Sequence, residues 1–223
     1  CKRVALINKG EFSKALDMIT SSTSSKKQQQ PQQPEEDEQQ LLFQKAYCLY
    51  RLNRCQEAYD IVCNNASILS DDDDGDDSDA MVQHLKAQIE YKMGRYDASA
   101  HTYQSISGDR SDIDHDEFLT NLSAALTLDQ QYESALKTCK QGSSYELDYN
   151  ASCATIGLKQ YDTSFSLLKQ AEAKCRAAGE QDGLDEQEIE NDLTAITVQT
   201  ACVKQLTGDV DGALQIYNEI LSR

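Results

Sequence analysis

The sequence contains no tryptophan and only two prolines, Pro31 and Pro34, which both lie in one glutamine-rich stretch. Proline interrupts helices, so a long body without it, in which alanine, leucine and glutamine are common, is typical of a helical protein. Alternating β-branched residues are also scarce, which leaves an all-β fold without support. We therefore predict an all-α protein, and 223 residues are enough to bury a sizeable core.

Long apolar runs and basic clusters are missing as well. No stretch approaches the ~20 apolar residues of a membrane helix, and no signal peptide is recognisable, so we expect no membrane insertion. The net charge is −17, but eleven negative charges fall in two runs, 35–38 and 71–79, which leaves −6 for the other residues. Without clustered Lys and Arg, a surface for nucleic acid is not expected. The remaining charge suits a basic or neutral protein partner.

Residues that would indicate catalysis or metal binding do not occur in the required patterns. The eight cysteines include no CxxC pair and are scattered through apolar positions, which predicts reduced, buried thiols in a cytoplasmic protein. In the acidic run, a calcium loop with Gly75 at its sixth place would have Met81 where a bidentate glutamate is needed. No phosphate loop or nucleophile motif is present. We expect no enzyme activity, metal, cofactor or small-molecule substrate.

A repeated pattern runs through the chain instead. Six tight polar turns, 9–12, 52–55, 93–96, 129–132, 158–161 and 207–210, are each followed three residues later by a small side chain. Four residues further on stands a larger one. The small residues after the turns are Ala15, Ala58, Ser99, Ala135, Ser164 and Ala213, and a second set upstream of five turns is Ala46, Ala87, Ser123, Ser152 and Ala201.

This pattern resembles the tetratricopeptide repeat, whose two-helix units recur every ~34 residues. The small residues let the second helix of a hairpin, helix B, approach the first, helix A, and the larger residue fills the gap to the next hairpin. We predict a right-handed superhelical solenoid of about six such hairpins with irregular loops, forming one protein-binding domain over 1–223. Because the chain begins at Cys1, we expect a fragment. Disordered loops are predicted near 21–38 and 70–79, a short fourth helix B ending near Gly142, and another loop from Ala178 to Asp185.

The helix-A residues beside the small position would face the inside of the superhelix, where arrays of this type hold ligands. Tyrosine rings offer contact area and a hydrogen bond, and amides can bind a peptide backbone, although each tyrosine could equally pack between helices. The predicted concave helix-A face consists of Phe43, Tyr47, Tyr50, His84, Gln88, Tyr91, Thr120, Asn121, Ala124, Tyr149, Asn150 and Cys153.

Five longer strings are more specific than the repeat pattern. They are KAYCLYRLNR at 45–54, YKMGRYD at 91–97, TNLSAAL at 120–126, YNASCATIG at 149–157 and LLKQAEAKCR at 167–176. In this order they resemble the amino-terminal repeat domain of the family of the 72-kilodalton subunit of the signal recognition particle. The resemblance implies a scaffold that binds the carboxy-terminal region of the 68-kilodalton subunit as a heterodimer, in the particle that targets ribosomes to the endoplasmic reticulum. It also implies that the particle RNA is bound through a region outside this fragment.

Two other functions stay open at this point. In chaperone-binding tetratricopeptide domains an asparagine, at the place of Asn121 and Asn150, helps to hold a peptide carboxylate, so a co-chaperone adaptor for peptide tails is the alternative. The lysine and arginine that would supply its counter-charge are missing here. RNA binding by the domain itself would require steeply salt-dependent affinity.

Overall fold

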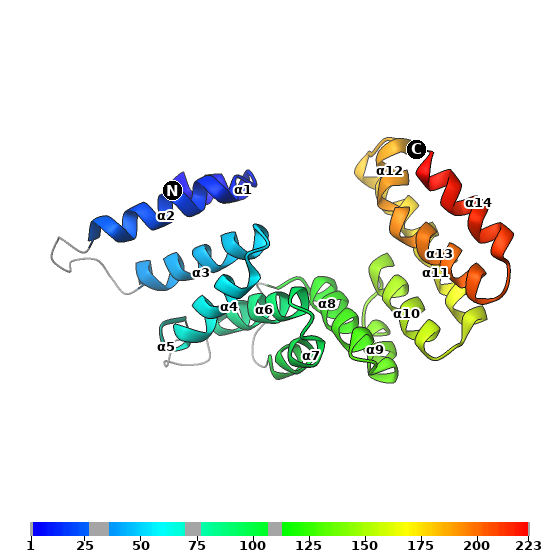
Figure 1. The fold of residues 1–223 in the computed structure, drawn as a ribbon, viewed down its shortest axis with the longest axis horizontal. Helices are drawn as coiled ribbons and strands as arrows, with labels where there is room; N and C mark the ends of the chain where they lie inside the picture. The colour runs from blue at the N-terminus through cyan, green and yellow to red at the C-terminus, as the bar shows by residue number, and fades with distance from the viewer. Residues whose placement is uncertain (1, 27–35, 70–76, 107–112, 223) are drawn as a thin grey trace. The chain divides into compact units, whose positions relative to one another are not determined.

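The computed structural model of the chain describes residues 2–26, 36–69, 77–106 and 113–222, and all regular structure in these ranges is α-helical (Figure 1). This confirms the predicted all-α fold. The helices are α1 (Lys2–Asn8), α2 (Phe12–Lys26), α3 (Glu36–Arg51), α4 (Cys55–Asn64), α5 (Ala66–Leu69), α6 (Asp77–Lys92), α7 (Tyr96–Ser105), α8 (His115–Leu128), α9 (Tyr132–Cys139), α10 (Tyr145–Gly157), α11 (Tyr161–Asp182), α12 (Glu186–Asp192), α13 (Thr194–Leu206) and α14 (Val210–Leu221).

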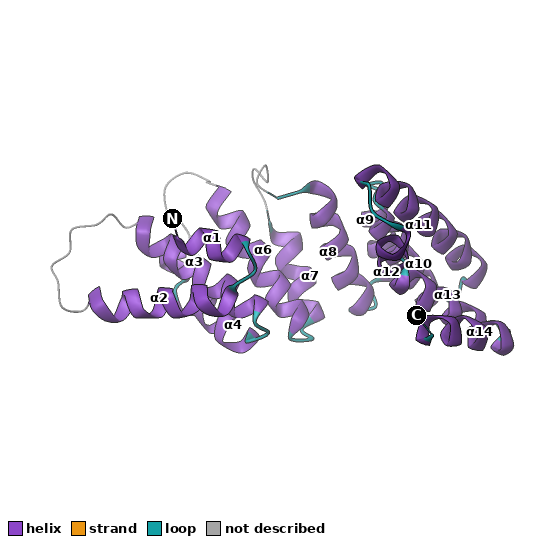
Figure 2. Ribbon diagram, turned by 90° about the horizontal axis from the view of Figure 1, so that it is seen from above, coloured by secondary structure: helices purple, strands orange, loops and turns teal. Residues whose placement is uncertain are grey.

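Six pairs of these helices form hairpins at the predicted turns. Unit 1, Cys1–Ile113, contains the hairpins α1–α2, α3–α4 and α6–α7, and unit 2, Asp114–Arg223, contains α8–α9, α10–α11 and α13–α14 (Figure 2). Within unit 1, α3 packs on α2 and α6 packs on α4; within unit 2, α10 packs on α8 and α13 packs on α11. Packing of each hairpin on its neighbour is the arrangement of a helical repeat protein. The right-handed superhelix and the single domain over 1–223 stay predictions.

Every hairpin turns at one residue with a left-handed backbone. The second residue of each turn has φ between 60° and 93°. The next residue donates its N–H to the carbonyl five residues earlier, as Arg95 N does to Glu90 O at 2.9 Å. This bond closes the end of helix A in the manner of a Schellman motif. The six left-handed residues are Gly10, Asn53, Gly94, Gln130, Lys159 and Gly208.

The small residues of the pattern lie where the two helices of a hairpin meet. All eleven are at most 2 % exposed. In the hairpin α6–α7 the contact is direct, because Ser99 Oγ donates to the Ala87 carbonyl at 2.8 Å. The larger residues four places after the helix-B small residues are buried in five hairpins, and Tyr217 in the sixth is half-buried. The core therefore follows the two-position pattern seen in the sequence.

The helices extend into both predicted inserts. α2 continues to Lys26, α3 begins at Glu36 and α6 begins at Asp77, so the helical ends replace part of the expected loops. The rest of these predicted loops, 27–35 and 70–76, lies outside the described residues. The fourth helix B is short as predicted, since α9 has eight residues.

The predicted loop from Ala178 to Asp185 is wrong over most of its length. α11 continues to Asp182 and ends at Gly183, which has φ of 75°. Gly179 lies inside the helix because α12 packs closely there, and a Cβ on Gly179 would lie 2.7 Å from Ile189 Cγ1. The glycine that suggested a loop instead permits a close contact between helices.

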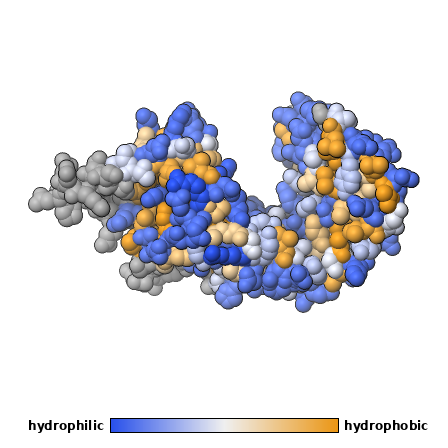
Figure 3. Space-filling model, viewed as in Figure 1, coloured by the Kyte–Doolittle hydropathy of each residue, from blue (hydrophilic) through white to orange (hydrophobic). Residues whose placement is uncertain are grey.

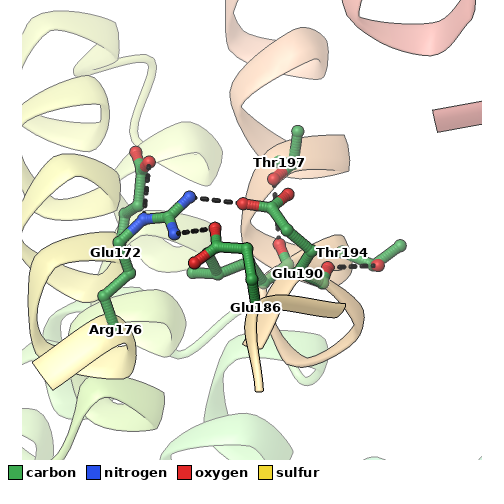
Figure 4. Close-up of polar contacts among 7 residues, drawn as sticks. Glu172, Arg176, Glu186, Glu190, Thr194 and Thr197 are labelled. Carbon is green, nitrogen blue, oxygen red and sulfur yellow. Dashed lines mark hydrogen bonds and ion pairs between the residues drawn. The ribbon is translucent and has the colours of Figure 1, made fainter. Parts of the chain in front are cut away.

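An ion-pair network holds α12 against α11 (Figure 4). Arg176 of α11 contacts Glu186 at 3.0 Å and also Glu190, both on α12, and lies 4.0 Å from Glu172 on its own helix. Asp185 and Glu188 form a capping box that starts α12. A guanidinium can satisfy several carboxylates at once, so one arginine fixes a helix that the repeat pattern does not contain.

Replacement of Gly94 tests the geometry of the turns. Gly94 has φ of 74° and a Cβ there would meet no atom within 4 Å, so a side chain adds only backbone strain. We expect Gly94→Ala to lower the free energy of unfolding by about 1 kcal/mol, measured by urea denaturation. Gly94→Asn is the control, because asparagine tolerates the left-handed region and should cost less. Equal losses for the two variants would contradict this account of the turn.

Candidate protein-binding surface

Ten of the twelve predicted binding residues share one flank of helix A, whereas Asn121 and Asn150 stand two residues before the small residue, 160° around the helix from it. At 100° per residue, positions three before, one after and four after the small residue lie 40° to 100° around the helix from it. The small residue itself faces helix B and is fully buried. The flank therefore lies beside the hairpin contact, and the partner helix covers only part of it, as α7 does where Tyr103 meets His84 and Tyr96 meets Tyr91. We refer to these positions as the helix-A flank.

In unit 1, the helix-A flank of α3 consists of half-buried aromatic residues. Phe43, Tyr47 and Tyr50 pack against the edge of the unit 1 core. Tyr47 meets Phe12 edge-to-face with ring centroids 6.0 Å apart, and lies 6.4 Å from Tyr50. These tyrosines pack between helices and also present atoms to the surface, and their role in binding stays a prediction.

On α6, the predicted residues differ in how much they expose. His84 is buried, meets the Tyr103 ring at 5.5 Å between centroids, and has its Nε2 3.0 Å from Gln88 Nε2. Tyr91 is half-buried and packs on Tyr96. Because His84 is 6 % exposed, Gln88 and Tyr91 offer most of the surface of this helix-A flank.

In unit 2, Asn150 has a structural use. Its side chain is 9 % exposed, and Nδ2 donates to the Thr120 carbonyl at 2.9 Å and to Ser123 Oγ at 3.0 Å. These bonds join α10 to α8. The amide that a chaperone-tail adaptor would offer to a peptide carboxylate is thus directed at a neighbouring helix, which weakens that alternative. Thr120, Asn121, Ala124, Tyr149 and Cys153 are all half-buried and keep part of their surface exposed.

The thiols near this surface are held in the protonated form. Burial raises the pKa of Cys153, and it raises the pKa of Cys139 to about 11. A thiol reacts as its thiolate, so a raised pKa lowers reactivity at neutral pH. Within the described ranges, no three His, Cys, Asp or Glu side chains come together to hold a metal ion. The same part of the chain has no helix that is long and apolar enough to cross a membrane.

Several surface residues at equivalent positions were not predicted. Val198 on α13 stands three residues before the small residue Ala201. In the first hairpin, the position twelve residues before Ala15 is residue 3, so Val4 on α1 stands one residue after it. Both valines therefore belong to the helix-A flank, and both are more than a third exposed. The constant interval of twelve residues between the two small positions of a hairpin would have located them. Hydrophobic residues reach the surface in both units (Figure 3). Those of unit 2 are Leu128, Val198, Leu206, Val210, Leu214 and Leu221.

Asn150 and Asn121 form a matched pair for testing these assignments. We expect Asn150→Ala to lower the free energy of unfolding by about 1.5 kcal/mol, because it removes two hydrogen bonds between buried groups of α10 and α8. Asn121→Ala, at a half-buried position, should cost less than about 0.5 kcal/mol. Urea denaturation of the two variants measures both. A loss for Asn150→Ala as small as that for Asn121→Ala would show that the buried bonds contribute nothing.

Comparison with known proteins gives one consistent result. No family model matches the chain. Over 225 residues, 99 % of its length, the chain is 32 % identical to signal recognition particle subunit SRP72 of Canis lupus familiaris and 31 % identical to that of Homo sapiens. It is 26 % identical to SRP72 of Dictyostelium discoideum over 229 residues. The chain spans 30 % of the length of each of these relatives. Along the region that it shares with them, the chain belongs to the family of signal recognition particle subunit SRP72.

Proposed function

We propose that the chain is the protein-binding region of a subunit of the signal recognition particle. In this proposal it binds the carboxy-terminal region of the 68-kilodalton subunit and so supports co-translational targeting to the endoplasmic reticulum from the cytoplasm. The observation that carries the proposal is the similarity of 99 % of the chain to SRP72 of animals and a slime mould. The particle RNA would be bound through a region outside this chain.

The packing of the hairpins supports a scaffold role. Helix B covers one side of helix A, and the helix-A flank beside it keeps half-buried aromatic and amide side chains at the surface. Partly exposed tyrosines bury area at an interface with little loss of side-chain entropy, since most of their rotamer freedom is already restricted. The twelve predicted contact residues stay a proposal, with His84 and Asn150 contributing mainly to packing.

The described chemistry gives no support to catalysis. Burial raises the pKa of Cys48, Cys139, Cys153 and Cys175, which disfavours a nucleophilic thiolate. A protein that acts by holding two other components together requires no reactive group. We therefore propose a non-enzymatic role that needs neither a cofactor nor a small-molecule substrate.

A substitution on the helix-A flank of unit 2 tests the proposal. Ala124→Arg places a long charged side chain on the half-buried flank of α8. We expect it to weaken binding to the recombinant carboxy-terminal region of the 68-kilodalton subunit at least tenfold, because the arginine side chain would occupy space that the partner fills at the interface. Isothermal titration calorimetry gives the affinities, and thermal melting of each variant verifies folding.

Thr163→Arg is the matched control. It adds the same charge at an exposed position of α11, a helix B. This variant should bind within twofold of the unmodified chain. If Ala124→Arg binds as well as the control, the helix-A flank of unit 2 is not the binding surface; if the unmodified chain does not bind at all, the proposed partner is wrong.

A further inference from the structure

Charge is distributed unevenly between the two units. Among the unit 1 residues whose side chains are described, ten Lys and Arg stand against seven Asp and Glu. In residues 114–222 of unit 2, seven Lys and Arg stand against 19 Asp and Glu, a net charge of −12. Residues 1–113 as a whole carry 13 Lys and Arg against 19 Asp and Glu, a net charge of −6, because most acidic residues of unit 1 lie outside its described side chains. The attraction of an acidic partner segment to unit 1 would therefore depend on where its described cations lie, and not on the net charge of the unit.

Cations of both units form ion pairs, as Lys14, Arg54 and Lys86 do in unit 1. In unit 2, Lys174 pairs with Asp148 at 2.7 Å, Lys204 pairs with Asp209 at 2.6 Å, and Arg176 is surrounded by carboxylates. In unit 1, Arg51 and Lys92 are exposed and form no ion pair with any side chain that the structure describes. Their positive charge is therefore not neutralised by a described neighbour.

These two cations are instead fixed on aromatic rings. The Arg51 guanidinium carbon lies 4.5 Å from the Phe12 ring centroid and 5.7 Å from that of Tyr47, and Nη1 donates to the Tyr47 hydroxyl at 2.8 Å. Lys92 Nζ lies 4.4 Å from the Tyr50 ring centroid and donates to the Tyr50 carbonyl at 3.3 Å. Since the Tyr47 and Tyr50 centroids are 6.4 Å apart, the five residues are contiguous across α2, α3 and α6.

We propose that Phe12, Tyr47, Tyr50, Arg51 and Lys92 form a docking strip for an acidic peptide segment of the partner protein. Carboxylates of the segment pair with Arg51 and Lys92, and its apolar side chains pack on the intervening rings. The proposal rests on the proposed function for the identity of the partner. It adds the chemistry of the segment and three residues, Phe12, Arg51 and Lys92, that lie outside the predicted helix-A face.

The arrangement suits carboxylate binding for a physical reason. Each cation is held by a cation–π contact and one hydrogen bond, so less side-chain entropy is lost when a ligand arrives. One nitrogen of Arg51 donates to Tyr47, which leaves the other donors of the guanidinium fork for a carboxylate. A peptide is favoured over single-stranded RNA because one face of the Phe12 and Tyr50 rings is already covered by a cation, whereas bases need open ring faces. Two cations are also few for a polyphosphate chain.

The test measures the complex of the chain with the carboxy-terminal region of the 68-kilodalton subunit at 0.15 M salt. The double variant Arg51→Gln/Lys92→Gln should raise the Kd at least tenfold and flatten its dependence on salt concentration. Arg95→Gln is the matched control, because Arg95 is also exposed and stacks 4.8 Å from the Tyr59 ring, outside the strip. This variant should bind within twofold of the unmodified chain.

Carbodiimide, which couples amines to carboxylates, should link Lys92 to the partner, and should not link Lys169, which stacks on Phe165 in unit 2.

The outcomes of these experiments distinguish the docking strip from the proposed function. If the double variant has a normal melting curve and binds with the Kd of the unmodified chain, the docking strip is wrong and the proposed function is unaffected. If the double variant melts at a lower temperature, Lys92→Gln alone is measured and judged by the same criterion. If the unmodified chain does not bind the 68-kilodalton region, a 12-residue peptide of alternating Glu and Leu is compared with its Gln counterpart. Glu-dependent binding that the double variant loses supports the strip, and equal binding of the two peptides overturns it. The docking strip is also wrong if the unmodified chain binds a 12-nucleotide single-stranded RNA but not the Glu peptide, and the double variant no longer binds the RNA.

Discussion

The structure depends on the close contact between two small side chains in five of the six hairpins that the structure describes. Their positions are twelve residues apart, and the contact places a helix-B residue directly on the backbone of helix A, as Ser99 does on Ala87. A longer side chain at either position would force the helices apart, because close-packed cores absorb added volume poorly. Once this side of helix A is occupied by helix B, the helix-A flank is left for packing on the neighbouring hairpin and for an external partner.

The predicted helix-A residues differ in how much of their surface this packing leaves exposed. Asn150 is buried and directed at α8 of the preceding hairpin, whereas His84 is buried against Tyr103 of its own hairpin. Residues nearer the end of helix A, such as Tyr50 and Tyr91, keep more of their surface. In unit 1 that end also carries Arg51 and Lys92, so recognition of a partner would combine aromatic area with positive charge. In unit 2, Lys174, Arg176 and Lys204 are paired with carboxylates of the same unit.

Much of this fold could be predicted from spacing alone, because turns and small residues impose local, short-range constraints. The turn at Lys159 was found without a glycine, although its φ of 60° is unusual for lysine. The junction of α11 and α12 could not be predicted, since Gly179 looks like a loop residue until Ile189 is seen to pack on it. Asn150 was assigned to binding for a similar reason: the sequence contains no information that Ser123 and the Thr120 carbonyl lie within reach. The role of such residues can be assigned only when the packing between neighbouring helices is known.

The central claim is that a partner binds the side of helix A that helix B leaves uncovered. Hydrogen–deuterium exchange of the chain, alone and in complex with the carboxy-terminal region of the 68-kilodalton subunit, tests it most directly. The account predicts slower exchange in α3, α6, α8 and α10 on binding, and unchanged exchange in α4, α7, α9 and α11. Slower exchange confined to the helix-B segments, or complex formation without any change in the helix-A segments, would contradict it.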